Sequence, residues 1–321
     1  MSELRSVLVT GAAGYIGGLV VRALAGRRSE LSGLVALDVR EPPPSDRLDG
    51  VVYVNKSVCD ATLADVLAEH HVDTIVHLAS ILKPPKNGGE DLAYQVDVEG
   101  TRNVLASALK HRVKKLIVTT SGAAYGYHPD SPSWLTEADP IRGNEEIAYS
   151  RHKRLIENDL ERYRRDHPEL GQLVFRPGTV IGAGVSTPVT ELFEAKLMVG
   201  VAGSNSPFVF IWDQDVVECI VRGVFGPETG IYNLAGDGAL SPQEIAARLG
   251  KRYLPLPAGL IAGALSVLKR LGKSPYGPEQ VKFLRYRPVL SNRALKERFG
   301  YTPQKTSREA FELYALGVAA R

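Results

Sequence analysis

The sequence has few cysteines, little net charge and no pair of histidines with metal-ligand spacing. The two cysteines, Cys59 and Cys219, lie far apart and belong to no CxxC pair, which fits a reducing compartment better than a disulfide framework. A net charge of +3 over 321 residues gives no sign of the clustered basic face that nucleic-acid binding requires. His70 and His71 are adjacent and would point to different sides of a helix, so we expect no metal site.

Long hydrophobic runs are also missing. The longest, residues 254–268, contains two prolines and is shorter than the roughly 20 apolar residues that a transmembrane helix needs. We therefore expect no membrane span. The run is either the buried core helix of a small domain or an apolar wall that meets a hydrophobic substrate or a membrane surface. A strand-like segment begins within the first ten residues, which argues against a signal peptide and favours a cytoplasmic protein.

A glycine-rich segment follows the first apolar segment, residues 6–10 (SVLVT). Residues 11–17 read GAAGYIG, with Gly11, Gly14 and Gly17 in GxxGxxG spacing, and apolar residues then recur at helical intervals. Strand, glycine turn and helix are the context of a dinucleotide site, because glycines let backbone N–H groups approach a pyrophosphate at a helix N-terminus. The alternative is a tight strand-to-helix turn without a ligand.

An acidic residue ends the second apolar segment, residues 34–37. Asp38 lies 21 residues after Gly17, where a carboxylate would hydrogen-bond the adenosine ribose hydroxyls and repel a 2′-phosphate. This favours NAD, although Arg40 could accept the phosphate and leaves NADP possible. Asp60 stands at the head of a helix-like segment and is either an N-cap or a contact to the adenine edge.

Short apolar segments alternate with helical patterns through the first half of the chain. The strand candidates cover residues 6–10, 34–37, 51–54, 73–79 and 116–120. This alternation predicts an α/β fold with a doubly wound parallel sheet, in which ligands bind outside the carboxyl ends of the strands. Asp38 and Ser121 lie at such ends. Leu78, Ala79 and Ser80 lie at the carboxyl end of the fourth candidate and would lie over the cofactor, so the sequence predicts one shared site.

The pattern loosens after a sixth strand candidate at residues 173–176. We expect residues 1–182 to form an NAD(P)-binding Rossmann domain and residues 183–321 to form mainly a smaller α/β substrate-binding domain. A helical pattern and a short strand pattern within residues 210–236 are expected to return to the Rossmann core.

Tyr149 and Lys153 form a YxxxK pair, and Ser121 stands just past the fifth strand candidate. At positions i and i+4, the tyrosine and the lysine share one face of a helix. A tyrosine hydroxyl has a solution pKa of about 10, and an ammonium beside it favours the tyrosinate. We therefore expect Tyr149 to act as acid and base at a substrate oxygen that Ser121 holds. The alternative is an i, i+4 pair on a helix surface without a catalytic role.

Together these segments resemble the extended short-chain dehydrogenase/reductase family, also called the NAD-dependent epimerase/dehydratase family. The matching segments are TGAAGYIGG, the acids at positions 38 and 60, HLAS, VEGTRNV, TSGAAYG, YSRHK and FRPGTVIG, within about residues 5–182. Looser matches, such as FIWDQDVVECI, IYNLAG and SNRALKERFGYTP, follow in the second half.

The resemblance implies that Ser121, Tyr149 and Lys153 are the catalytic residues. It also implies contacts to the cofactor from Tyr15 and Ile16 at the pyrophosphate, from Asp60 and Ala61 at adenine, and from Pro177 near nicotinamide. A homodimer is implied through the helices that begin near residues 91 and 149.

The departures from the family pattern bear on the reaction. Family members usually carry Asn where this chain has Asp97, at a position that supports the active site. Family dehydratases carry an Asp-Glu pair after the catalytic hydroxyl residue, whereas Gly122 and Ala123 follow here, so we do not expect a dehydratase. Nucleotide-sugar epimerases place an arginine near the position of Phe208, and its absence from that stretch argues against a diphosphate clamp.

The expected function is that of an NAD-dependent oxidoreductase or epimerase, with hydride transfer at a secondary alcohol or ketone. A net dehydrogenase and a nucleotide-sugar 4-epimerase that recycles its bound NAD would use the same residues, so both remain open. The expected substrate is a small molecule that is hydrophobic or nucleotide-linked. A protein of a different class, a non-catalytic dinucleotide-binding sensor or scaffold, would have no need of the serine, tyrosine and lysine.

Overall fold

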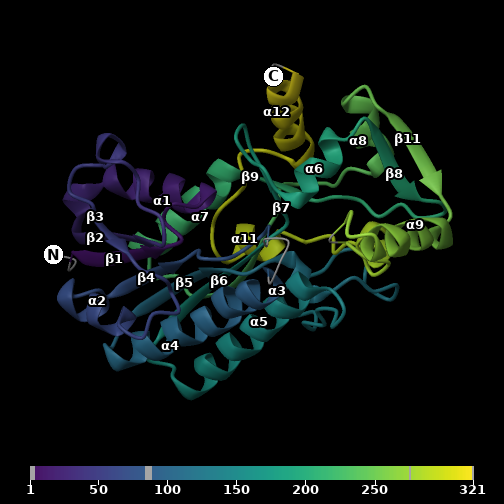
Figure 1. Cartoon of the computed structure of the whole chain (residues 1–321). Coiled ribbons are helices and arrows are strands. Elements are labelled where there is room, and N and C mark those ends of the chain that lie inside the picture. Colours follow the sequence, from purple (N-terminus) through teal and green to yellow (C-terminus); the bar gives the residue numbers. More distant parts are fainter. Residues whose placement is uncertain (1–3, 84–88, 275, 320–321) are drawn as a thin grey trace.

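The computed structural model describes residues 4–83, 89–274 and 276–319, and its largest element is a seven-stranded parallel sheet (Figure 1). The strand order is β10-β6-β5-β4-β1-β2-β3, so the order of the strands reverses between β1 and β4. The bounds are β1 Arg5–Thr10, β2 Leu31–Asp38, β3 Val52–Asn55, β4 Thr74–His77, β5 Lys115–Thr119, β6 Gly171–Pro177 and β10 Gly230–Leu234. The predicted doubly wound sheet is confirmed.

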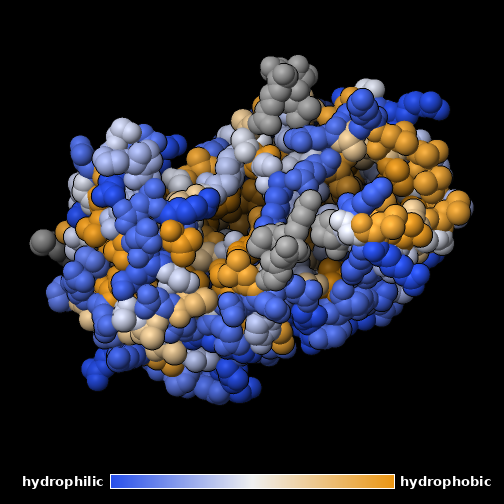
Figure 2. All heavy atoms as spheres, viewed as in Figure 1, coloured by the Kyte–Doolittle hydropathy of each residue, from blue (hydrophilic) through white to orange (hydrophobic). Residues whose placement is uncertain are grey.

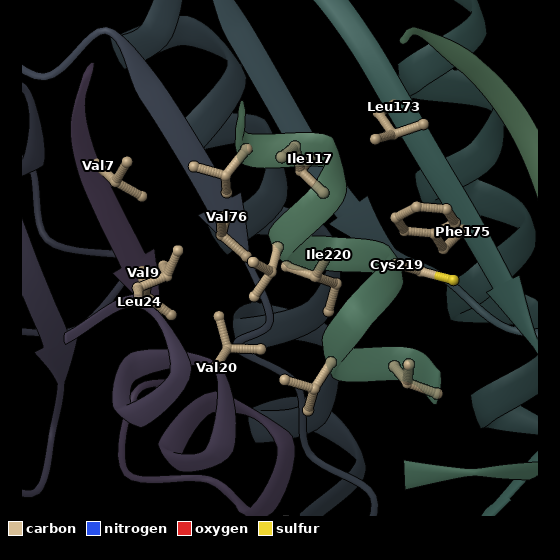
Figure 3. Packing of buried hydrophobic residues seen from close by; sticks show 14 of the residues in the cluster. Val7, Val9, Val20, Leu24, Val76, Ile117, Leu173, Phe175, Cys219 and Ile220 are labelled. Atoms are coloured by element: carbon tan, nitrogen blue, oxygen red, sulfur yellow. The ribbon is translucent and has the colours of Figure 1, made fainter. Parts of the chain in front are cut away.

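Helices cover both faces of this sheet because its strands are apolar on both sides. Along β1, Val7 and Val9 point to one face and Leu8 to the other, as the two-residue period of a strand requires. Figure 3 shows the first face, where α1 and α7 pack over the sheet around Cys219 and Ile220. The helices of this face are α1 Tyr15–Ala25 and α7 Asp213–Phe225, and those of the other are α2 Leu63–Glu69, α4 Gly100–Lys110 and α5 Ala148–Asp166.

The rest of the chain forms two small parallel sheets and a group of helices around an aromatic core. The strands are β7 Thr179–Ile181 with β9 Phe210–Trp212, and β8 Leu197–Val201 with β11 Arg252–Leu256. The helices are α6 Pro188–Glu194, α8 Pro242–Arg248, α9 Ala258–Arg270, α10 Gln280–Arg285, α11 Arg293–Glu297 and α12 Ser307–Ala319. Phe193 lies at the centre of this core, with its ring edge against Phe208 and Phe311. A helix α3, Gly89–Tyr94, leads through a π-helical turn, Gln95–Glu99, into α4.

The apolar run at residues 254–268 does not form a buried core helix, so that alternative is wrong. Its first residues belong to β11, and α9 begins after Pro257. In α9 only Ile261 is buried, because the outer side of the helix has no element of the described chain over it. Among the described residues, no helix has the length and apolar character that crossing a bilayer requires.

Candidate functional site

The predicted site residues gather at the carboxyl ends of the central strands. β1, β2 and β4 are neighbours in the sheet, so the glycine loop, Asp38 and the segment 78–80 meet at one edge. β5 lies beside β4 and brings Ser121 to the same edge. The strand order reverses here, which is where open α/β sheets bind ligands.

The glycine loop requires glycine for steric reasons. Gly11 has φ +68°, and a Cβ there would lie 2.6 Å from Ala79 N. A Cβ at Gly17 would lie 2.0 Å from Gly11 O, so α1 starts directly against the loop. Gly14 N donates to Gly11 O at 2.9 Å and closes the turn, and Tyr15 and Ile16 then begin the helix. The first-turn N–H groups of α1 therefore stand at the strand ends, as a pyrophosphate site needs.

Asp38 borders the glycine loop. Its Oδ2 accepts from Ala13 N at 3.0 Å, which fixes the carboxylate at the carboxyl end of β2. Arg40 lies beside it, with Nε 3.6 Å from Asp38 Oδ1 and a largely exposed side chain. The carboxylate is thus held in place for ribose hydroxyls, while the arginine is already engaged with the same carboxylate.

Asp60 forms a local turn two residues before Thr62, the N-cap of α2, and is not itself the N-cap. Its Oδ1 accepts from Thr62 N at 2.8 Å and from the Thr62 hydroxyl at 2.7 Å, just before α2 begins. These hydrogen bonds, from the backbone first, lower the pKa of Asp60. Its contact and that of the exposed Ala61 to adenine remain predictions.

Tyr149 and Lys153 share the first turns of α5 and meet the cofactor side of the sheet. Lys153 is 3% exposed, and its Nζ donates to the exposed Ser80 Oγ at 3.0 Å. The same Nζ lies 5.3 Å from the centroid of the Tyr149 ring. The lysine therefore places its charge between the phenol ring and the segment that follows β4.

Ser121 caps the short helical turn Gly122–Tyr125, and its Oγ accepts from Ala123 N at 3.1 Å. The start of α5 is fixed to this turn, because Ser150 Oγ donates to Ala123 O at 2.7 Å. Tyr149 itself packs against the apolar cluster that contains Ala123. The structure thus brings the predicted serine turn, tyrosine and lysine together from two segments of the chain.

Asp97 is a site residue whose role the sequence left open. It lies in the π-helical turn, is 1% exposed, and its Oδ1 accepts from Ile81 N at 3.0 Å. Its Oδ2 lies 3.8 Å from His152 Nδ1. Burial opposes its ionisation, but the charge of Lys153, the nearby polar groups of His152 and Ser80 and the hydrogen bond from Ile81 N outweigh it and lower the pKa of Asp97. The lysine at the site therefore has a buried counter-charge, which an Asn would not provide.

A buried histidine also stands behind the site. His77 ends β4 and lies between two hydroxyls, with Nδ1 2.7 Å from Thr10 Oγ1 and Nε2 3.0 Å from Thr101 Oγ1. Thr101 donates its own proton to Asp97 O at 2.5 Å. His77 must then donate from Nε2 and accept at Nδ1, so it is held as one neutral tautomer. Burial first, and the charge of Lys153 second, lower the pKa of His77 to about 4.

We predict that buried His77 makes the stability of the fold sensitive to acid. Its pKa of about 4 in the folded protein lies below the ordinary histidine pKa of 6.5, so between these values the unfolded chain binds the proton and the folded one does not. The contribution of neutral His77 to the free energy of unfolding is therefore complete above pH 6.5. It is lost as the pH falls toward 4, by about 3 kcal/mol in total. We expect His77→Gln to flatten the fall in unfolding free energy between pH 7 and pH 4.5, measured by urea denaturation (about 3 kcal/mol at most). His70→Gln is the control, and an unchanged slope in His77→Gln would contradict the expectation.

Tyr15 links the glycine loop to the start of α7. Its hydroxyl donates to Asp213 Oδ2 at 2.5 Å, and burial with this contact raises the pKa of Tyr15 to about 12. Asp213 is buried, whereas Tyr15 is 41% exposed. The predicted pyrophosphate residue is thus held by a carboxylate that sequence reasoning did not single out.

A wall of aromatic residues and one arginine stands beside Tyr149. Tyr127 is buried against Phe283, with ring centroids 5.4 Å apart, and both pack in the cluster that includes Tyr149. The Arg287 guanidinium lies 3.7 Å from the centroid of Phe208 and 4.8 Å from that of Phe283. The residues next to Phe208 in the sequence include no arginine, and from this we expected none beside its ring. That expectation is wrong, because the fold brings Arg287 to the Phe208 ring from a distant segment.

Not all of the N–H groups of Arg287 have a hydrogen-bond partner. Its Nη1 donates to Ser206 O at 2.7 Å, while its buried Nε has no hydrogen-bond partner. Burial lowers the pKa of Arg287 to about 9, which leaves the group cationic at neutral pH. A cavity of about 310 Å³ opens beside it and is lined by residues 128–129, 131–133, 205–207, 285–287 and 289.

The sequence of this chain matches the model of a known protein family. Residues 7–234 match the model described as "NAD dependent epimerase/dehydratase family". The chain belongs to this family. The resemblance inferred from the motifs is therefore confirmed.

Two relatives extend over nearly the whole chain. An uncharacterised protein of Mycobacterium tuberculosis is 25% identical over 315 residues, which cover 97% of this chain and 83% of that protein. A UDP-glucose 4-epimerase of Mycolicibacterium smegmatis is 28% identical over 319 residues, which cover 92% of this chain and 93% of that protein.

Two solved structures share the fold. UDP-glucose 4-epimerase from Thermotoga maritima, solved with UDP-glucose, has a TM-score of 0.74 at 17% identity and covers 98% of this chain and 99% of its own. dTDP-glucose 4,6-dehydratase from Bacillus anthracis, solved with NAD, has a TM-score of 0.73 at 18% identity. The match covers 99% of this chain and 97% of the dehydratase chain. At these identities the likeness establishes the fold.

NAD is the cofactor of the family, and the strand-end residues of this chain fit it. The glycines let the loop pack directly against Ala79 and the start of α1, where a Cβ would collide with backbone, and Asp38 is fixed beside the loop. Lys153 and Ser80 stand at the far end of the same edge, beside Tyr149. The fixed carboxylate favours ribose hydroxyls over a 2′-phosphate.

Proposed function

We propose that this protein is an epimerase that inverts a secondary alcohol carbon of a sugar carried on a diphosphate. The observation that carries the proposal is the position of the Lys153 ammonium, which contacts Ser80 at the cofactor edge and faces the Tyr149 ring. A dinucleotide-binding sensor would not need this arrangement of charge and phenol. The close relatives named as UDP-glucose 4-epimerases support the substrate class.

Each catalytic side chain has a separate task in this proposal. NAD supplies the hydride acceptor when it is bound. Tyr149 takes the proton of the substrate hydroxyl as the alcohol becomes a ketone, and returns it after the ketone is reduced on the opposite face. Lys153 stabilises the phenolate, and Ser121 donates a hydrogen bond to the substrate oxygen. Asp97 balances the charge of the lysine.

The diphosphate is assigned to Arg287. Its guanidinium is cationic, is stacked on Phe208, and borders the cavity of about 310 Å³. An arginine suits a diphosphate because its planar fork donates to two oxygens at once. Phe283 connects Arg287 to Tyr149, because it packs in the cluster of Tyr149 and Tyr127 and its ring centroid lies 4.8 Å from the Arg287 guanidinium.

Epimerisation is favoured over dehydration by the residues after Ser121. Gly122 and Ala123 supply no acid or base to the carbon next to the alcohol, and elimination of water needs both. A dehydratase is among the similar structures, but at 18% identity that likeness concerns the fold. Homodimerisation through the helices that begin near residues 91 and 149, which are α3 with its continuation α4 and α5, remains a prediction, to be checked by sedimentation.

The experiment is to incubate the protein as purified with UDP-glucose, UDP-galactose or their N-acetyl forms, without added dinucleotide. We expect interconversion of one pair at the 4-position, no build-up of reduced cofactor, and release of NAD when the protein is denatured. A protein that releases no dinucleotide, or that turns over only when fresh NAD is supplied, would refute the epimerase.

A further inference from the structure

The outer face of the small domain carries a set of exposed apolar side chains. We call this set the apolar patch: Leu197 and Val199 of β8, Leu254 of β11, and Leu260, Val267, Leu268 and Leu271 of α9 and its end. α8 and α10 contact β8 and leave the opposite face of the β8–β11 pair open. Figure 2 shows hydrophobic surface over β8, β11 and α9.

The apolar side of α9 points outward, which is the reverse of an ordinary surface helix. Leu260, Ala264, Val267 and Leu271 recur at three- and four-residue intervals and are all exposed, with Leu260 at 63% and Leu271 at 62%. A helix that is apolar on all sides is normally covered all round. At about 1.5 Å per residue, this helix of 13 residues is too short to cross a bilayer, but it can lie in the plane of one.

The segment of the chain that contains α9 has a strongly positive net charge. Residues 249–287 contain eight lysines and arginines and one glutamate, a net charge of +7, whereas the whole chain carries +3. The remainder of the chain is therefore acidic, with a net charge of −4. Lys269, Arg270 and Lys273 stand at the C-terminal end of α9, next to Leu268 and Leu271, and are exposed.

We propose that the apolar patch docks this protein on an anionic phospholipid bilayer, with α9 lying in the interface. An exposed apolar helix face bordered by cations is the pattern of an interfacial helix, and anionic lipid headgroups complement the charge. A second copy of the chain is disfavoured as the cover, because it would bring two cationic segments, each with Lys269, Arg270 and Lys273 exposed, together.

Docking would place the bilayer beside the substrate pocket. α10 follows α9 along the chain and contacts it. Phe283 of α10 and the neighbouring Tyr286 pack in the cluster that includes Tyr149 and Tyr127. The wall of the candidate active site thus continues into the segment that carries the patch.

The test is flotation of the full chain with vesicles of phosphatidylcholine alone or mixed with phosphatidylglycerol. We expect binding to the mixed vesicles that weakens at high salt, since the headgroup attraction is screened. Leu260→Ser with Val267→Ser and Leu271→Ser should weaken partitioning by about tenfold or more. Arg270→Ser should weaken it about fivefold, and adding Lys273→Ser about fivefold again.

The matched control combines Lys110→Ser and Leu316→Ser, which remove an exposed cation and an exposed apolar side chain on α4 and α12. This control should bind vesicles like the wild type, and all variants should keep their unfolding temperature because the altered residues are exposed. No binding to mixed vesicles, or equal binding by the triple variant, would overturn the proposal. So would a dimer in sedimentation that the triple variant abolishes, since a second copy would then cover the patch.

Discussion

Replacing Tyr149 with Phe should reduce turnover by about 100- to 10,000-fold, the range that a positioned acid–base group contributes. The substitution removes only the hydroxyl oxygen, and the ring keeps its contacts with Ala123 and Tyr127. Binding of NAD and the unfolding temperature should remain close to those of the wild type. Turnover of the UDP-sugar pair and the NAD released on denaturation measure the two effects separately.

The matched control is Tyr163→Phe at the far end of the same helix, where the ring packs beside His167. It removes an equal group without touching the strand-end site, so its turnover should equal that of the wild type. If Tyr149→Phe kept full turnover, proton transfer would have to come from another group. If it also lost its NAD, the hydroxyl would be a binding group rather than the acid and base.

Breaking the buried pair of Arg176 and Glu157 should destabilise the fold by about 3–5 kcal/mol, because the remaining charge is buried without its partner. Arg176 is 3% exposed and Glu157 4%. The pair is bidentate, with Arg176 Nε 2.9 Å from Oε1 and Nη2 2.9 Å from Oε2. Glu157 also accepts from Thr120 Oγ1 at 2.5 Å, and Arg176 Nη1 donates to Tyr125 OH at 2.9 Å.

Thr120 and Tyr125 flank the Ser121 turn, so the pair also supports the catalytic serine. Arg176→Met and Glu157→Leu should each lower the free energy of unfolding in urea and reduce turnover. The double variant should recover most of the lost stability, since no unpaired charge is left. Glu161→Gln, on an exposed position of α5, should change stability by less than about 0.5 kcal/mol. Additive losses in the double variant would show that the pair is not coupled.

The sheet and the central chemistry were predictable because both are encoded locally. Each strand is a short apolar segment, and the Tyr149–Lys153 pair needs only one helical turn to bring its members together. The glycine loop is likewise contiguous, and the steric need at Gly11 and Gly17 follows from one turn of the chain.

The remaining features depend on packing between distant segments, which periodicity does not encode. Arg287 reaches Phe208 from 79 positions further along the chain. Asp97 could be read as a departure from a family pattern, but its electrostatic interaction with Lys153 depends on the packing of its π-helical turn against α5. The exposure of α9 could not be read from its apolar sequence, because burial is decided by whether another element covers the helix.

The most direct test of hydride transfer at this site follows deuterium placed on the sugar carbon that is inverted. If a bound dinucleotide takes the hydride and gives it back, the deuterium stays on the same carbon of the product. Proton exchange at Tyr149 involves only the oxygen, so no deuterium should enter the water. Loss of the label to solvent, or uptake of solvent hydrogen at that carbon, would mean that a C–H proton is removed by a base and would contradict the mechanism.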